Sequence, residues 1–275
     1  MSTIIHQDYS IHVASSAVTP FDAYWTMDGG ADNDPRYDSI HNTPIYTDGG
    51  YNMDMGAVGG IIGGALGPVN ITSDVYSAMA RTYSPNPSMT SNGSEVSMAF
   101  WLKKSRFDKD CYPYGVINIM PTFGVTVEVL NGIDPRIALS LRFVQQTGLY
   151  PAVTQCLFGI GSQYVNTSTD ITATFPVVFD VWEFWHMSCD AGGVVSLSRN
   201  GGADVYMGGI VPVAPDFNKY QIAFGDTPPP YNWRRFNNGA LDEVYFRGGL
   251  KFTPTQIAYL YNGGAGRTWP IVLPP

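Results

Sequence analysis

The sequence predicts an all-β fold, an antiparallel two-sheet jelly-roll sandwich that carries one short helix near its C-terminus. Two observations predict this fold. Short segments of alternating apolar and polar residues recur along the 275 residues, separated by turn-forming pairs such as Asn-Gly and Gly-Gly. Only the segment 253–263 combines the start and stop signals of a helix. Many short strands with frequent turn signals are typical of antiparallel sandwiches and jelly rolls.

The chain is expected to divide into an N-terminal arm, residues 1–20, and one sandwich domain with loop insertions, residues 21–275. The arm is short, mixed in composition and ends at Pro20. No internal repeat and no linker divides the remainder, so a single large β domain is predicted.

The clearest strand is segment 95–105, EVSMAFWLKKS. Its apolar residues alternate with Glu95, Ser97 and Lys103, which predicts one face in the core and one polar face. The other predicted strands lie within 21–28, 125–132, 135–146, 156–165, 171–179, 184–190, 194–202, 220–226 and 241–246.

The single helix has a complete set of local signals. Thr253 is a good N-cap, and Gln256 stands where it completes a capping box. Pro254 falls at the first helical position, and Gly263 is expected to end the helix. One helix face carries the apolar residues Ile257, Leu260 and Tyr261. A helix this short is unstable alone, so it is expected to pack against the half-buried strand 241–246.

Composition and charge exclude some functions. Charged residues make up 14% of the chain, against about 25% in average globular proteins. A surface built from neutral polar residues suits contact with a sugar or with neighbouring subunits. The net charge is −8 and no run of Lys or Arg occurs, so no nucleic-acid partner is expected. The first residues do not read as a signal peptide, and no apolar segment is long enough for a membrane span.

The order of landmarks along the chain resembles a known family. AYWTMDGG, SMAFWLKK, WEFWHMSCDAGGVVSLSRNGG and GALDEVYFRGGLKFTPTQIAYLYNGG follow one another between residues 21 and 265. This series is similar to the concanavalin A-like, laminin-G-like jelly-roll family. Segments 111–155 and 227–238 are longer than the family pattern needs. With the arm, they are candidate sites for subunit contacts.

The resemblance implies one possible cofactor, a calcium ion at the rim of the sandwich. Asp28, Asp38 and Asn42 lie in the early loop, and Asp242 belongs to the terminal motif that returns to the same region in the family. Oxygen ligands of this kind suit calcium. The alternative is that Asp28 and Asp38 form turns and that Asp242 accepts backbone N–H groups.

Catalytic motifs are not found, so the chain is expected not to be an enzyme. Jelly-roll glucanases in this family use alternating acidic residues on one strand, and no such run occurs here. Asp242 and Glu243 are expected on opposite faces of their strand. No G-x-S-x-G elbow occurs, and the four histidines have no metal-binding spacing.

Sugar binding would need exposed aromatic side chains next to hydrogen-bonding groups. The candidate contact residues come from two loop segments: Tyr231, Asn232, Trp233 and Arg234, followed by Tyr112 and Tyr114. The same residue types also anchor protein interfaces, and both interpretations stay open. The tryptophans in or beside predicted strands are expected to pack in the core: Trp25, Trp101, Trp182 and Trp185.

Two functions follow from these expectations. The first is a non-enzymatic virion protein, a capsid decoration or tail-associated component, because bacteriophage particles carry domains of this family. Its partners would be other virion proteins, copies of itself or a host surface glycan, and it would be synthesised in the host cytoplasm. The alternative is a stand-alone carbohydrate-binding module that depends on calcium. Fold alone does not choose between them.

Overall fold

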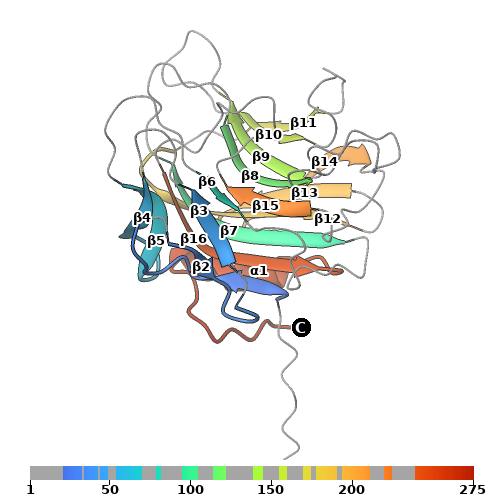
Figure 1. The fold of residues 1–275 in the computed structure, drawn as a ribbon. Helices are drawn as coiled ribbons and strands as arrows, with labels where there is room; N and C mark the ends of the chain where they lie inside the picture. The colour runs from blue at the N-terminus through green and yellow to red at the C-terminus, as the bar shows by residue number, and fades with distance from the viewer. Residues whose placement is uncertain are drawn as a thin grey trace, which may run out of the picture.

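A computed structural model describes the fold of this chain over fourteen segments, which include all of β16, the single helix and the C-terminal residues (Figure 1). The described residues are 21–32, 34–42, 44–48, 54–69, 79–81, 95–104, 114–121, 139–144, 155–159, 170–174, 178–190, 194–210, 220–224 and 239–275. The predicted arm, residues 1–20, and the predicted strand 125–132 lie outside them. Within these segments no helix is long and apolar enough to cross a membrane.

The first sheet contains the strand that the sequence predicted most clearly. Its order is β14-β13-β12-β7-β16-β5-β4, and β1 also pairs with β16. All of these pairings are antiparallel. The strands are β1 (Ala23–Trp25), β4 (Asp54–Gly59), β5 (Gly64–Val69), β7 (Val96–Lys104), β12 (Trp182–Cys189), β13 (Val194–Arg199), β14 (Val205–Ile210) and β16 (Gly239–Gly248).

The second sheet has the order β11-β10-β9-β8-β15-β6-β3-β2 and is also antiparallel. Its strands are β2 (Arg36–Tyr37), β3 (Pro44–Asp48), β6 (Met79–Arg81), β8 (Tyr114–Pro121), β9 (Leu139–Val144), β10 (Gln155–Gly159), β11 (Asp170–Thr174) and β15 (Tyr220–Phe224). The all-β, antiparallel two-sheet sandwich that the sequence predicted is confirmed.

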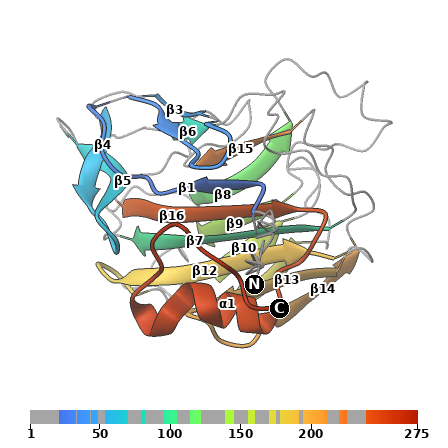
Figure 2. The ribbon, with the colours of Figure 1, turned by 90° about the horizontal axis from the view of Figure 1, so that it is seen from below.

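The central strands of the first sheet, β12, β7 and β16, are buried on both faces. Figure 2 shows the helix α1 (Pro254–Tyr261) lying across this sheet, with strands of the second sheet behind it. An aromatic-rich cluster fills the space under the helix: Phe21, Tyr24, Ala99, Trp101, Phe184, Tyr245, Phe252, Ile257, Leu260 and Ile271. The prediction that segment 241–246 is half-buried was therefore wrong, because the helix and the C-terminal residues cover its second face.

The ends of α1 follow the predicted signals closely. Thr253 accepts a hydrogen bond from the Gln256 N–H at 3.2 Å, and the Gln256 side chain accepts one from the Thr253 N–H at 3.1 Å. The capping box is thus confirmed. The helix ends one residue earlier than expected, because Asn262 adopts the left-handed conformation and leads into the short 3₁₀ turn η3 (Asn262–Gly264).

Thr253→Ala is expected to lower the free energy of unfolding by about 1 kcal/mol, because the variant leaves the Gln256 N–H without its acceptor. Thr253→Ser keeps the hydroxyl group and serves as the matched control. Urea denaturation of the three proteins measures the difference. Equal stability of the Ala and Ser variants would show that the capping hydroxyl contributes nothing.

Candidate functional site

Two of the predicted calcium ligands, Asp28 and Asp242, meet at one hairpin turn. The turn joins β4 to β5 at residues 60–63. Asp28 Oδ1 accepts a hydrogen bond from the Gly64 N–H at 2.5 Å. Asp242 Oδ2 accepts from the Ile61 N–H at 2.8 Å and from the Ile62 N–H at 3.2 Å. The structure therefore brings these two carboxylates to the same turn, where each accepts backbone N–H groups.

Glycine is required where this turn approaches the carboxylates. A Cβ atom at Gly60 would lie 2.2 Å from the Gly64 carbonyl oxygen and 2.5 Å from Asp242 Oδ2. At Gly63, a Cβ atom would lie 2.5 Å from Asp28 Oδ1, and φ there is +64°. A side chain at Gly60 would clash with the Gly64 backbone and with Asp242, and one at Gly63 would clash with Asp28. The two glycines therefore allow the turn to close against both carboxylates.

Asp242 stands directly before a β-bulge in β16, in which Glu243 and Val244 lie opposite Phe100 of β7. Asp242 lies opposite Trp101 of β7, and Tyr245 lies opposite Ala99, so two residues of β16 share the space of one residue of β7. Glu243 has a positive φ of 48°. Both acidic side chains are buried. The sequence did not predict this bulge, because a bulge depends on which strand lies alongside.

Burial changes the acidity of both carboxyl groups. Burial raises the pKa of Asp242 to about 7, against the three backbone N–H groups that favour the charged form, and the charge of Asp28 adds to the rise. Burial likewise raises the pKa of Glu243 to about 8. The hydroxyl groups of Tyr24 and Tyr245 both donate to Glu243 Oε2.

The other two predicted ligands, Asp38 and Asn42, belong to the turn that joins β2 to β3. Asp38 accepts backbone hydrogen bonds from Tyr24 at 2.9 Å, Ile40 at 3.0 Å and His41 at 2.8 Å. Asn42 has a φ of 59°, and its N–H donates to the Asp38 carbonyl at 2.9 Å. These contacts are those of turn-forming residues.

The fit to calcium is limited by the contacts already made. Both oxygens of Asp38 and both oxygens of Asp242 accept backbone N–H groups. In the part of the chain that the structure describes, no group of three or more His, Cys, Asp or Glu side chains is arranged to hold a metal ion. Calcium binding by Asp28, Asp38, Asn42 and Asp242 stays a prediction.

Most of the predicted sugar-contact residues lie outside the described part of the chain. These are Tyr112 and the loop residues Tyr231, Asn232, Trp233 and Arg234. Tyr114 is the first residue of β8. Their role in binding stays a prediction. By contrast, the tryptophans expected in the core are buried or partly buried there: Trp25, Trp101, Trp182 and Trp185.

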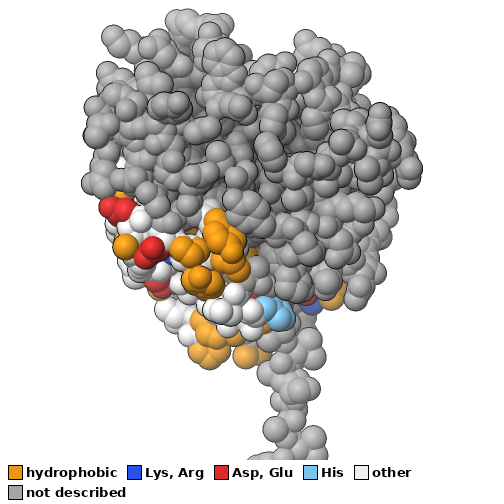
Figure 3. Space-filling model, viewed as in Figure 1, with side chains coloured by type: hydrophobic (Ala, Val, Ile, Leu, Met, Phe, Trp, Pro, Cys, Tyr) orange, Lys and Arg blue, Asp and Glu red, His pale blue; other side chains and the backbone are white. Residues whose placement is uncertain are grey.

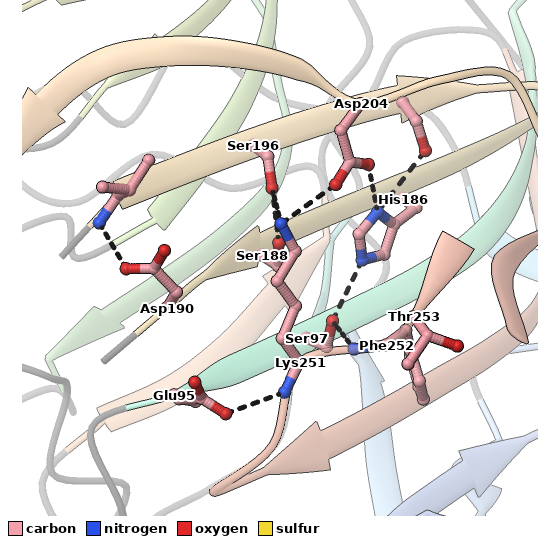
Figure 4. A network of polar contacts seen from close by, with 12 residues as sticks. Glu95, Ser97, His186, Ser188, Asp190, Ser196, Asp204, Lys251, Phe252 and Thr253 are labelled. Atoms are coloured by element: carbon pink, nitrogen blue, oxygen red, sulfur yellow. Dashed lines mark hydrogen bonds and ion pairs between the residues drawn. The ribbon is translucent and has the colours of Figure 1, made fainter. Parts of the chain in front are cut away.

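A second polar cluster, which the sequence did not reveal, lies between the first sheet and the segment before α1 (Figure 4). Ser97 Oγ lies 3.0 Å from His186 Nε2, and His186 Nδ1 lies 3.6 Å from Asp204 Oδ1. Lys251 Nζ forms an ion pair with Asp204 at 2.9 Å and donates to Ser196 Oγ at 2.6 Å. The cluster thus joins β7, β12 and β13 to the chain that enters the helix.

The order serine, histidine, aspartate in this cluster is also that of a nucleophile and its base. Ser97 and His186 are completely buried, however, and Ser97 Oγ also accepts the Phe252 N–H at 3.0 Å. Burial lowers the pKa of His186, which favours the neutral imidazole. Burial alone would raise the pKa of Asp204, but hydrogen bonds from His186 and Lys251 outweigh it and lower this pKa to about 2. The geometry therefore supports a structural role.

Sequence reasoning missed this cluster for a simple reason. Ser97, Ser196 and Ser198 alternate with apolar residues, which is also the pattern of a solvent-exposed strand face. His186 and Asp204 lie far from Ser97 in the sequence. The one sequence feature that could have indicated this cluster was a strand with a polar face together with a short, well-capped helix, which is stable only when it packs against another element.

The fold and these sites define a class of protein, an antiparallel two-sheet β sandwich closed on one face by a short helix. The chain matches no described sequence family and no curated protein.

Solved structures share this architecture. Domain 4 of AbnA, a GH43 extracellular arabinanase from Geobacillus stearothermophilus, was determined in complex with arabinotriose. It is similar with a TM-score of 0.54 and 18% identity, over 87% of this chain and 97% of that domain.

The binding domain of botulinum neurotoxin serotype D/C is similar with a TM-score of 0.55 and 11% identity, over 88% of this chain and 51% of that one. The botulinum neurotoxin DC binding domain in complex with rat synaptotagmin II has a TM-score of 0.52 and 12% identity, over 84% of this chain and 50% of that one. This chain therefore spans about half the length of the neurotoxin binding domains. At these identities the likeness concerns the fold.

Proposed function

We propose that this chain is a non-enzymatic carbohydrate-binding β sandwich. The observation that carries the proposal is the likeness to domain 4 of the arabinanase, whose structure contains arabinotriose and whose fold matches over 97% of its length. The low charge content supports the same function, because a neutral polar surface suits a neutral, hydroxyl-rich ligand. The site of binding is a separate question from the fold.

The proposal that the chain is not an enzyme rests on two groups of acidic and nucleophilic side chains in the described segments. Asp242 and Glu243 are buried and hydrogen-bonded within the sandwich. Ser97 and His186 are buried beneath the chain segment that precedes α1. A substrate would have no direct access to either pair, which favours binding without chemistry.

We further propose that the sandwich is a surface component of a virion, where it contacts other virion proteins or copies of itself and a host surface glycan. This proposal rests on the family resemblance of the sequence and on its low-charge composition. The alternative, a stand-alone carbohydrate-binding module, predicts the same glycan affinity without any particle.

The test of glycan binding is an array of neutral and acidic oligosaccharides and bacterial polysaccharides, arabinotriose included, probed with the folded protein. We expect at least one reproducible hit among the neutral saccharides. Repeating the assay with calcium and then with a chelator tests the predicted metal dependence. If the protein binds no saccharide on the array although calorimetry shows that it is folded, the carbohydrate proposal is overturned.

The same assay tests the predicted contact loop. Replacing Tyr231 and Trp233 by alanine is expected to abolish the glycan hit while the melting temperature stays nearly unchanged. Loss of folding would show instead that these two aromatic residues belong to the core.

A further inference from the structure

An exposed pair of aromatic side chains lies on the outer face of the β2–β3 hairpin. In the register of this pair, Tyr37 lies opposite Pro44, and Arg36 lies opposite Ile45. Residues opposite each other in an antiparallel pair point to the same face of the sheet. Tyr46 is two residues beyond Pro44 and so points to the same face as Tyr37.

The two tyrosines are therefore diagonal neighbours, which in antiparallel strands stand roughly 7–8 Å apart. Tyr37 is 52% exposed and Tyr46 is 42% exposed, and Pro44 between them is half-buried. We call these three side chains the β2–β3 platform. Six large apolar side chains in the described segments are exposed, and Tyr37 and Tyr46 are the two aromatic ones among them.

The opposite face of the hairpin is buried, which explains why the platform side chains point toward solvent. Ile45 is completely buried and Arg36 is nearly so, and the Arg36 guanidinium donates to the Asp34 carbonyl at 2.6 Å. Turning the hairpin over would expose Ile45 and bury both tyrosine rings. A shift of one residue in strand register has the same result, so the register is strongly determined.

The turn beside the platform is also held in place. Asp38 accepts three backbone N–H groups and so fixes residues 39–42. This turn presents His41 and Asn42 to solvent. Figure 3 shows hydrophobic side chains gathered over this part of the surface, with a histidine on one side and acidic side chains on the other.

These features together match the chemistry of a saccharide. One face of a sugar ring carries C–H groups that pack on an aromatic face, while its hydroxyl groups need hydrogen-bond partners at the edge. The platform supplies two tyrosine rings and one proline ring, and the turn supplies an imidazole and an amide. Nearby carboxylates and a net charge of −8 disfavour acidic sugars.

We infer that the β2–β3 platform is a binding site for a neutral oligosaccharide, in which Tyr37 and Tyr46 each pack against a sugar ring. This inference rests on the proposed carbohydrate-binding function and assigns a site to it. It differs from the loop at 231–234, so both surfaces can be tested in the same protein.

The experiment compares the wild type with Tyr37→Ala/Tyr46→Ala in calorimetric titrations with the best neutral oligosaccharide from the array, and with arabinotriose. We expect the double variant to bind at least about tenfold more weakly, because two stacking surfaces are lost. Tyr37→Phe/Tyr46→Phe keeps both rings and is expected to bind within about threefold of the wild type. Val181→Ala, an exposed apolar substitution before β12, is the control at another surface position.

Each outcome has a distinct meaning. Both tyrosines are exposed, so all variants are expected to melt at the wild-type temperature. If the wild type binds a saccharide and the double Ala variant binds it equally well, the platform is not the site, although the proposed function stands. If the wild type binds no saccharide at all, the proposed function fails and this inference with it. If the double Ala variant loses binding to a protein partner but keeps its affinity for the saccharide, the platform is a protein interface and the inference is overturned.

Discussion

Lowering the pH from 8 to 6.5 is expected to stabilise this protein by on the order of 3 kcal/mol. Burial raises the pKa of Glu243 to about 8, of Asp242 to about 7 and, against the charge of Arg199, of Glu183 to about 7. In the unfolded chain these groups titrate near pH 4. Between pH 4 and pH 8 the folded state therefore holds more protons, and stability falls as the pH rises.

His186 acts in the opposite direction at lower pH. Burial lowers its pKa, so below about pH 6.5 the unfolded state gains a proton that the folded state does not bind. Asp204 acts in the same direction as His186 at still lower pH, because its folded-state pKa of about 2 lies below its value in the unfolded chain. The stability that this difference contributes is present above pH 4 and is lost as the pH falls toward 2. The pH range from 6.5 to 8 is therefore where Glu243, Asp242 and Glu183 dominate the expected pH dependence among the described residues.

Glu243→Gln is expected to remove about half of this pH dependence, because the amide fills the same space and does not ionise. Relative to the wild type, the variant should gain about 2 kcal/mol of stability as the pH rises from 6.5 to 8, and its advantage should shrink as the pH falls. Urea denaturation at four pH values measures it. Asp180→Asn, at an exposed position, is the control and should follow the wild-type profile. Parallel profiles for the wild type and Glu243→Gln would show that Glu243 does not titrate in this range.

The second large effect is expected at Trp101, the largest side chain between β7 and the helix. Its ring packs against Phe184 at 5.2 Å and stacks on Tyr261 at 5.7 Å between ring centroids. Trp101→Ala is expected to lower the free energy of unfolding by about 3–5 kcal/mol, through lost contacts and the cavity that remains. Chemical denaturation monitored by circular dichroism measures this loss.

Trp101→Phe is the matched control, because it keeps an aromatic ring on Phe184 and Tyr261. The Trp101 Nε1–H is buried without a hydrogen-bond partner in the described structure, so its removal leaves no acceptor unpaired. We expect the Phe variant to lose less than half of what the Ala variant loses. Equal losses would mean that the indole itself, and not the packing under the helix, holds this part of the sandwich.

Local signals predicted the elements whose causes are local. The capping box at Thr253 and Gln256 depends on residues three positions apart, and it forms as the sequence indicated. The apolar alternation of β7 likewise predicted a strand with Phe100 and Leu102 in the core. Such features are readable because the residues that cause them are neighbours in the chain.

Features that depend on strand pairing were not readable. The bulge at Glu243 and Val244 exists only relative to β7. Ser97 looked solvent-exposed because its own segment does not indicate that the chain around Phe252, which precedes α1, covers it. The β2–β3 platform likewise requires the register that sets Tyr37 against Pro44. Each of these features depends on which distant segments lie side by side, and the sequence did not predict that pairing.

The position of β16 has a consequence for how the chain reaches its folded state. This strand lies between β7 on one side and β5 and β1 on the other, and all three precede it in the chain. During synthesis, the first sheet therefore lacks its central strand, β16, until residue 248 has left the ribosome. Until then β5 and β7 each present an open edge to other chains. Sheets that depend on such distant pairings also form slowly, so the nascent protein is expected to depend on chaperones more than its finished stability would suggest.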